Sequence, residues 1–159
     1  MQNTTLLFLI KKTEGKITDI CLAMKKRSFG AGRWNGVGGK LLGGESIEEA
    51  LLREAKEEID IESGPMSKVA ELAFTFANKP EWNQMVHVFT ATEWKGEPAE
   101  SEEMRPQWYK VSDIPFKDMW PDDIFWLPKV LEGELVRAAF TFGEKDVILD
   151  QKVETVSAL

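Results

Sequence analysis

Short apolar runs bounded by polar turn residues open the chain, a pattern typical of β-strands. The first two runs cover residues 4–12 and 17–26, and the polar segment of residues 13–16 separates them. Seven glycines then fall between residues 27 and 44, where the backbone must bend sharply or approach a ligand closely. We predict an opening β-hairpin, followed by a loop with short strand pieces at residues 34–37 and 39–42.

A helical period replaces the strand pattern after residue 45. Ser46 followed by Glu49 is a capping box, which marks the start of a helix. We expect this helix to end near Ile59, before Ser63-Gly64-Pro65. Its buried stripe should consist of the apolar residues spaced three and four apart, which are Ile47, Ala50, Leu51 and Ala55.

Strand-like runs return in the second half of the chain, at residues 69–77, 85–93 and 107–111. A second helix is predicted over residues 121–132, with Pro121 near its first turn, where a missing N–H is harmless. Pro128 should kink or divide that helix. The chain should close with a hairpin formed by residues 135–142 and 146–149 around Gly143.

This order of strands and helices predicts an α/β fold in one domain, residues 1–159, because no linker or repeat interrupts it. Helices should cover both faces of a mixed β-sheet in an α/β/α sandwich. The net charge of −7 repels nucleic-acid backbones and excludes a role in coating DNA or RNA. The apolar run at residues 6–10 is too short to span a membrane. We therefore expect a monomeric cytoplasmic protein that uses neither nucleic acid nor membrane as a partner. Cys21, the single cysteine, excludes an internal disulfide and a thiolate zinc site.

Acidic residues crowd one face of the first predicted helix. Glu54 is three and four positions before Glu57 and Glu58, so the three carboxylates share a face and repel one another unless a cation neutralises them. Oxygen ligands of this kind suit Mg²⁺, which shares its coordination shell with substrate phosphates. The alternative is a solvated acidic face without chemistry, which would not need Arg53 and Glu45 at fixed distances.

The spacing within GKLLGGESIEEALLREAKEEIDI, residues 39–61, resembles the signature of the Nudix hydrolases, enzymes that act on nucleoside diphosphates linked to another group. The sequence departs from that signature at one position, where Asp60 replaces a glycine. A glycine there would supply a left-handed helix end, and Asp tolerates this conformation better than most residues. We expect some loss of stability at Asp60 and no loss of chemistry.

Other segments resemble one branch of that family, the MutT homologues that hydrolyse oxidised purine nucleoside triphosphates. They are MKKRSFGAGRWNGVGGK (residues 24–40), VHVF (86–89), EMRPQW (103–108) and IPFKDMWPDD (114–123). The resemblance implies a nucleotide substrate, hydrolysed to the monophosphate and pyrophosphate. It also implies Mg²⁺ as the cofactor, with Mn²⁺ as the alternative ion.

The resemblance further implies the residues of the site. Glu58 should organise the attacking water, and Arg53 should hold the catalytic carboxylates in place. The expected metal ligands are the Gly38 carbonyl, Glu54, Glu57, Glu58 and Glu103. The expected substrate-binding residues are Thr5, Lys25, Phe29, Asn35, Val37, Gly38, Gly39, Lys40, Phe74, Phe76, Trp120, Pro121, Asp122 and Asp123, with the two lysines near phosphate.

The chemistry of these residue types agrees with base recognition. Trp120 offers a flat face for stacking, and the Asn35 side chain can donate and accept at a purine edge. Asp122 and Asp123 would repel each other if both were ionised, so we expect one to keep its proton. Proton exchange within this pair could let one pocket accept oxidised guanine and oxidised adenine. The alternatives are that Trp120 is simple core and that the two aspartates only cap the second helix.

Two departures bear on base preference: Val37 stands in place of a bulkier aromatic, and residues 81–84 form a slightly longer segment than in the resembled branch. Two other functions stay open from the sequence. One is a Nudix hydrolase for a different nucleotide, such as ADP-ribose or a dinucleoside polyphosphate. The other is a nucleotide-binding sensor without catalysis, which the intact Glu54, Glu57, Glu58 and Arg53 argue against.

Overall fold

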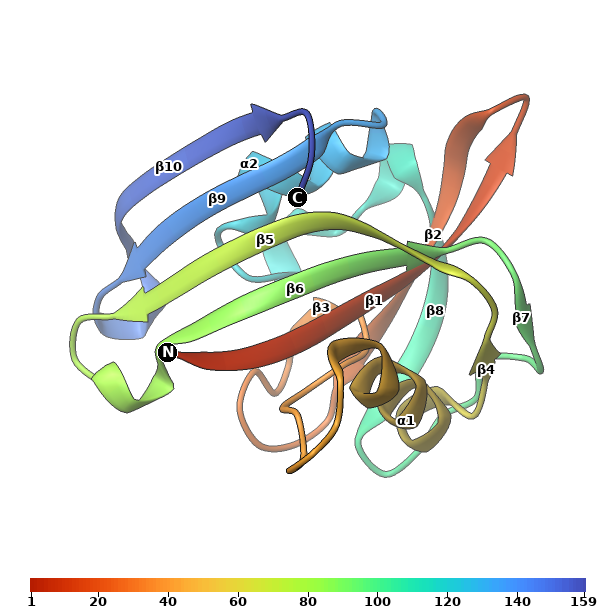
Figure 1. Ribbon diagram of the computed structural model, residues 1–159, viewed down its shortest axis with the longest axis horizontal. Helices are drawn as coiled ribbons and strands as arrows, with labels where there is room; N and C mark the ends of the chain where they lie inside the picture. The colour runs from red at the N-terminus through yellow and green to blue at the C-terminus, as the bar shows by residue number, and fades with distance from the viewer.

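The computed structural model describes all 159 residues and contains one eight-stranded mixed sheet (Figure 1). Its strands are β1 (Gln2–Thr13), β2 (Lys16–Lys25), β3 (Trp34–Asn35), β5 (Met66–Phe76), β6 (Gln84–Ala91), β8 (Met104–Lys110), β9 (Leu135–Phe142) and β10 (Ile148–Val156). They follow the order β10-β9-β5-β6-β1-β2-β3, and β8 also pairs with β2. The sequence did not predict the separate two-stranded ribbon of β4 (Glu62–Ser63) and β7 (Trp94–Lys95).

Strand β1 joins the two halves of the sheet. Its residues 2–9 run parallel to β6, and its residues 10–13 form an antiparallel hairpin with β2. The other pairs are β5 with β6 and β9 with β10, both antiparallel, and β5 with β9, which is parallel. Because both kinds of pairing occur, the predicted mixed sheet and α/β class are confirmed.

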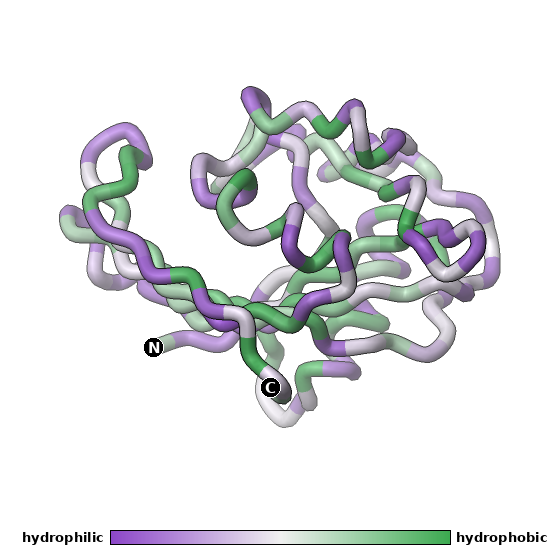
Figure 2. The backbone as a smooth tube through the Cα atoms, turned by 90° about the horizontal axis from the view of Figure 1, so that it is seen from above, coloured by the Kyte–Doolittle hydropathy of each residue, from purple (hydrophilic) through white to green (hydrophobic).

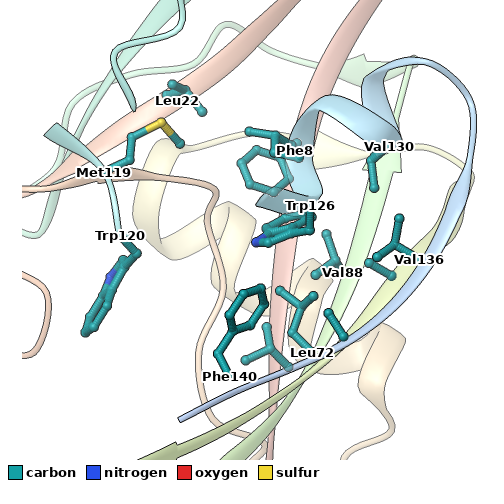
Figure 3. Close-up of a cluster of buried hydrophobic side chains, with 14 of the residues drawn as sticks. Phe8, Leu22, Leu72, Val88, Met119, Trp120, Trp126, Val130, Val136 and Phe140 are labelled. Atoms are coloured by element: carbon teal, nitrogen blue, oxygen red, sulfur yellow. The ribbon is translucent and has the colours of Figure 1, made fainter. Parts of the chain in front are cut away.

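Each face of the sheet carries one helix, α1 (Ile47–Ile59) or α2 (Asp123–Leu131). Side chains alternate between the faces along β1: Leu7 and Leu9 pack with the buried side of α1, whereas Phe8 and Ile10 belong to the cluster that contains α2. In Figure 3, Trp126 of α2 lies between Phe8 and Phe140, deep in that cluster. Figure 2 shows largely hydrophobic stretches where the strands cross the middle of the molecule and hydrophilic residues in the surrounding loops. The run from Leu6 to Ile10 in β1 is apolar throughout, because both of its faces are covered.

Helix α1 has the ends that its sequence predicts. The Ser46 hydroxyl accepts a hydrogen bond from the Glu49 N–H at 3.1 Å, and the Glu49 carboxylate accepts one from the Ser46 N–H at 3.0 Å. At the other end, Asp60 is in the left-handed conformation, with φ 57° and ψ 41°, and its N–H donates to the Lys56 carbonyl. The expected left-handed helix end is therefore confirmed without a glycine.

The predicted second helix is present, but the expected division at Pro128 is not. The helix begins at Asp123, two residues later than predicted, with Asp122 as its N-cap residue, so Pro121 lies near its first turn as expected. Pro128 lies inside the helix and does not divide it. The lost backbone hydrogen bond is outweighed because Trp126, Leu127 and Val130 are buried in the core on both sides of the proline.

The remaining boundaries differ from the predicted ones by a few residues. The final strand was expected at residues 146–149, but β10 runs from Ile148 to Val156 along the edge of the sheet. Short 3₁₀ helices complete the chain: η1 (Pro80–Trp82), η2 (Val111–Asp113), η3 (Phe116–Asp118) and η4 (Glu144–Asp146). Neither α-helix has the length and apolar composition needed to cross a bilayer.

Replacing Asp60 by glycine should stabilise the protein by about 0.5–1 kcal/mol, because a left-handed conformation strains any residue that has a Cβ. The Lys56–Asp60 ion pair, 2.8 Å long, would be lost, but both side chains are exposed and the pair contributes little. Urea denaturation followed by circular dichroism measures the change. Asp60→Ala is the control, since it removes the same charge and keeps the strain. Equal stability of the two variants would contradict the backbone explanation.

Candidate active site

A cavity of about 450 Å³ opens on the α2 side of the sheet. Its walls come from segments far apart in the chain: β1, β3, β5 and β6, the glycine-rich loop, and the segment that leads into α2. The predicted substrate-binding residues that line it are Thr5, Lys25, Phe29, Asn35, Gly38, Gly39, Lys40, Phe74, Phe76, Trp120, Asp122 and Asp123. The fold therefore brings together residues that the sequence separates by more than one hundred positions.

Aromatic rings form one part of the cavity. The Phe29 ring centroid lies 5.1 Å from that of Trp120 and 5.0 Å from that of Trp82. Phe76 contacts Phe29 edge-on at 6.1 Å. Trp120 is 9% exposed and stands at the rim of the buried cluster in Figure 3, whereas Phe29 is 46% exposed. Trp120 therefore packs against the core and lines the cavity at the same time.

Asp122 and Asp123 are fully buried beside these rings. The Trp126 indole N–H donates to Asp122 Oδ2 at 2.8 Å, while Asp122 Oδ1 and Asp123 Oδ2 have no hydrogen-bond partner. Burial raises the pKa of Asp122 to about 6. Burial, together with the charge of Asp122, raises the pKa of Asp123 well above its usual value. Although Asp122 is the N-cap residue of α2, its carboxylate makes no capping hydrogen bond to the helix.

Asn35 lines the cavity from β3, and the oxygen of its side-chain amide is already hydrogen-bonded. Its Oδ1 accepts a hydrogen bond from the Gly36 N–H at 2.8 Å. This bond fixes the side chain and leaves the amino group to donate to a ligand. Oδ1 keeps a second lone pair, so the expectation that Asn35 can both donate to and accept from a base stays a prediction.

The segment of residues 36–39 joins the cavity to the acidic helix. A Cβ on Gly38 would lie 2.0 Å from the Thr5 carbonyl oxygen, and one on Gly39 would lie 2.9 Å from Glu54 Oε1. At Gly38 only glycine permits the approach, because the opposing atom is backbone, whereas a side chain at residue 39 would displace the Glu54 carboxylate. The Gly38 N–H donates to Glu58 Oε1 at 2.9 Å, and the Thr5 hydroxyl lies within 3.3 Å of the Gly39 N–H and carbonyl.

Glu58 is the buried carboxylate of α1, with 2% of its surface exposed. Its Oε2 is buried without a hydrogen-bond partner. Burial and then the charge of Glu54 raise the pKa of Glu58 to about 8. A buried carboxylate with one free oxygen and a second carboxylate nearby is the environment that a hard cation stabilises.

Arg53 holds the other acidic residues of the helix. Its guanidinium binds both oxygens of Glu45, at 2.7 and 3.0 Å, and donates to Glu54 at 2.9 Å and to Glu57 at 3.3 Å. It also donates to the Lys40 carbonyl at 3.2 Å. These bonds raise the pKa of Arg53 and lower that of Glu45. Glu45, which the sequence places at a fixed distance from Arg53, is thus its main partner.

The predicted metal ligands are not gathered around a common point. No group of three or more acidic, histidine or cysteine side chains is placed to hold an ion. Glu54 and Glu57 are bound to Arg53, and Glu103 lies 3.6 Å from both Lys25 and Arg27. The donor set is composed of oxygen atoms and fits Mg²⁺ by its chemistry, and the assignment of these ligands stays a prediction.

Val37 and Pro121 lie outside the cavity, contrary to expectation. Val37 is buried in the core on the α1 side and pairs with Leu7, so its side chain points away from the cavity. Pro121 lines a separate shallow groove with Phe125 and Val147. In each case the next residue in the chain, Gly38 or Asp122, does line the cavity. Being next to a cavity residue in the sequence therefore does not show that a side chain points into the cavity.

Arg33, Trp82 and Trp126 are among the cavity residues that received no role from the sequence. Trp126 binds Asp122, and Trp82 packs on Phe29 and Phe76. Arg33 lies 4.2 Å from the Trp120 ring centroid. The sequence offered one signal for these contacts. Trp126 lies four residues after Asp122 on a predicted helix, and residues four apart on a helix share a face.

Comparison with known proteins identifies the family. A model of the NUDIX domain matches residues 2–130. The chain is 45% identical over 139 residues to the oxidized purine nucleoside triphosphate hydrolase of Mus musculus, covering 87% of this chain and 88% of that protein. The protein of the same name from Danio rerio is 45% identical over 140 residues, with 88% and 89% covered.

A solved structure agrees with the sequence comparisons. The mutator MutT protein from Bacillus halodurans superposes with a TM-score of 0.82 at 25% identity, covering 97% of this chain and 98% of that one. The matched domain contains the acidic helix, the glycine segment and the aromatic cavity described above. The chain therefore belongs to the Nudix hydrolase family.

Proposed function

We propose that this protein hydrolyses oxidised purine nucleoside triphosphates, such as 8-oxo-dGTP and 2-hydroxy-dATP, to the monophosphate and pyrophosphate. The cavity is the main support for this proposal, because an aromatic surface and a basic surface adjoin within it. Aromatic rings and a buried acid pair form one part, and Lys25, Lys40 and the Gly38–Gly39 backbone form the part next to Glu58. A purine base suits the first part, and phosphates suit the second. The 45% identity to hydrolases of that name supports the substrate class.

In this proposal Mg²⁺ or Mn²⁺ would be held by the Gly38 carbonyl, Glu54, Glu57, Glu58 and Glu103. When bound, the cation would neutralise charge on the phosphates and on the departing pyrophosphate. Glu58 orients the attacking water through its free Oε2, while the bond from Gly38 fixes its other oxygen. Arg53 limits the positions that Glu54 and Glu57 can take. Lys25 and Lys40 attract the triphosphate, which the net charge of −7 would otherwise repel.

The base is recognised by stacking and by a limited set of hydrogen bonds. Trp120 provides the stacking face, worth roughly 1–3 kcal/mol in comparable contacts. Asn35 donates through its amino group, and the Asp122–Asp123 pair offers one donor and one acceptor when it shares a proton. Removal of damaged nucleotides before polymerases use them is the biological purpose that follows.

The function is tested by pyrophosphate release from the purified protein with Mg²⁺. We expect kcat/KM for 8-oxo-dGTP to exceed that for dGTP at least tenfold, because the polar groups of the pocket match the oxidised base, and tenfold corresponds to about 1.4 kcal/mol in the transition state. ADP-ribose and a dinucleoside polyphosphate serve as comparison substrates. A higher kcat/KM for either of them would contradict the proposed substrate class.

Glu58→Gln should lower kcat at least about a hundredfold, because the amide cannot act as a base or bind a cation as the carboxylate does. Nucleotide affinity should stay within a few-fold, since glutamine can still accept the Gly38 hydrogen bond. Calorimetric titration measures the affinity, and Glu48→Gln, an exposed position on the same helix, is the control. A low wild-type rate that Glu58→Gln leaves unchanged would indicate a sensor and not an enzyme.

Asp123→Asn should stabilise the fold, and more at pH 8 than at pH 5. Above about pH 4 the unfolded chain loses protons that the folded acid pair retains, because both pKa values are raised on folding. The free energy of unfolding of the wild type therefore falls as pH rises from about 4 through the raised values. Asparagine removes one titrating group, and we expect a gain of roughly 1–3 kcal/mol at pH 8.

Thermal unfolding at pH 5 and pH 8 measures this difference. Asp113→Asn, which removes an exposed carboxylate, is the matched control and should show no such dependence. An equal shift in Tm at the two pH values for Asp123→Asn would show that the buried pair does not hold an extra proton.

A further inference from the structure

An ion pair outside the acidic helix ties the turn between β9 and β10 to the aromatic part of the cavity. Arg33 donates from its guanidinium to Asp146 Oδ2 at 2.8 Å. The same guanidinium lies 4.2 Å from the centroid of the Trp120 ring. Both side chains of the ion pair are only about a quarter exposed, at 27% and 28%. Asp146 therefore holds the Arg33 guanidinium, which lies over part of the Trp120 ring.

The turn that carries Asp146 is strained. Lys145 and Asp146 both have positive φ, 55° and 58°, although neither is a glycine. Each such residue costs on the order of 1 kcal/mol, and strain of this kind persists where surrounding contacts hold it. The ion pair with Arg33 is the contact that Asp146 makes outside its own turn. Phe142, at the end of β9, also contacts Trp120 with ring centroids 5.8 Å apart.

Arg33 also acts on the buried acid pair. Its positive charge lowers the pKa values of Asp122 and Asp123, against the larger effect of burial. Phe29 also contacts the Trp120 ring, but its side chain is 46% exposed and apolar, so no hydrogen bond or ion pair holds it there. Arg33, in contrast, is held beside the ring by its ion pair with Asp146.

We propose that Asp146 is a positioning residue for base binding, which holds Arg33 on Trp120 and thereby fixes the stacking ring. This rests on the proposed function, in which Trp120 stacks on a purine base. Asp146 lies beyond residue 130, where the match to the NUDIX domain ends. Discrimination between bases is therefore supplied partly by the final hairpin of the chain, outside the segments that hold the phosphates.

Two neighbouring glycine substitutions separate the ion pair from the strain. Asp146→Gly removes the carboxylate and relaxes a left-handed residue, while Lys145→Gly relaxes the adjacent left-handed residue and leaves the ion pair intact. Both variants should fold, because glycine prefers this conformation. Asp146→Gly should raise KM for 8-oxo-dGTP about three- to tenfold, the size of a lost cation–π contact, with kcat within about twofold. Lys145→Gly should match the wild type.

A second readout reports on Trp120 without catalysis. In ¹H–¹⁵N spectra the indole signal of Trp120, assigned by its loss in Trp120→Phe, should shift in Asp146→Gly and stay in place in Lys145→Gly. The signals of Trp94 and Trp108, which stack on each other on the α1 side, should not move in either variant. Arg33→Lys should also shift the Trp120 signal, because lysine keeps the charge and loses the planar guanidinium.

The two readouts keep the inference and the proposed function apart. If the wild type hydrolyses no oxidised purine triphosphate, the proposed function fails, and the Trp120 signal still decides whether Asp146 positions the ring. If the wild type is active, an unmoved Trp120 signal in Asp146→Gly overturns the inference. A loss of kcat at unchanged KM also overturns it.

Discussion

The backbone of residues 36–39 lies directly against β1, and the remainder of the site depends on this contact. The acidic helix packs on one face of the sheet, whereas the aromatic cavity opens on the other. Gly38 and Gly39 connect them, because their missing side chains let the loop approach the Thr5 carbonyl and the Glu54 carboxylate. The Gly38 N–H then reaches Glu58. A larger residue at position 38 would push the loop away from β1, and one at position 39 would displace the Glu54 carboxylate.

Buried acids mark both parts of the site, and each destabilises the fold that contains it. Glu58 and the Asp122–Asp123 pair all have raised pKa values, with burial as the main cause. All three have a carboxylate oxygen that no protein group satisfies. Apolar residues of similar size would pack without this penalty. Perturbed carboxylates in a cavity are a signature of function, whereas Glu45, which Arg53 satisfies fully, serves the structure.

Most of the fold can be predicted from the sequence, because local signals such as helix caps and apolar spacing favour the same elements that tertiary packing buries. The capping box of Ser46 and Glu49 fixes the start of α1, and Asp60 adopts the left-handed end that a glycine would otherwise supply. Local signals fail where tertiary packing decides. Pro128 continues a helix that its neighbours bury. Val37 follows cavity residues in sequence, yet the bend of the glycine segment turns it into the opposite core.

The same limit explains which parts of the site the sequence misses. Spacing within a helix has a fixed geometry, so the proximity of Arg53 to Glu57 and of Glu54 to Glu58 can be predicted from the sequence alone. Arg33, Trp120 and Asp146 lie in three different connections, and no local period relates them. Their contacts at 2.8 and 4.2 Å exist only because the sheet brings these connections to one end. The arrangement of residues on one helix can therefore be predicted from a short motif, whereas the contacts that link Arg33 to Asp146 and Trp120 across distant loops can be found only in the folded structure.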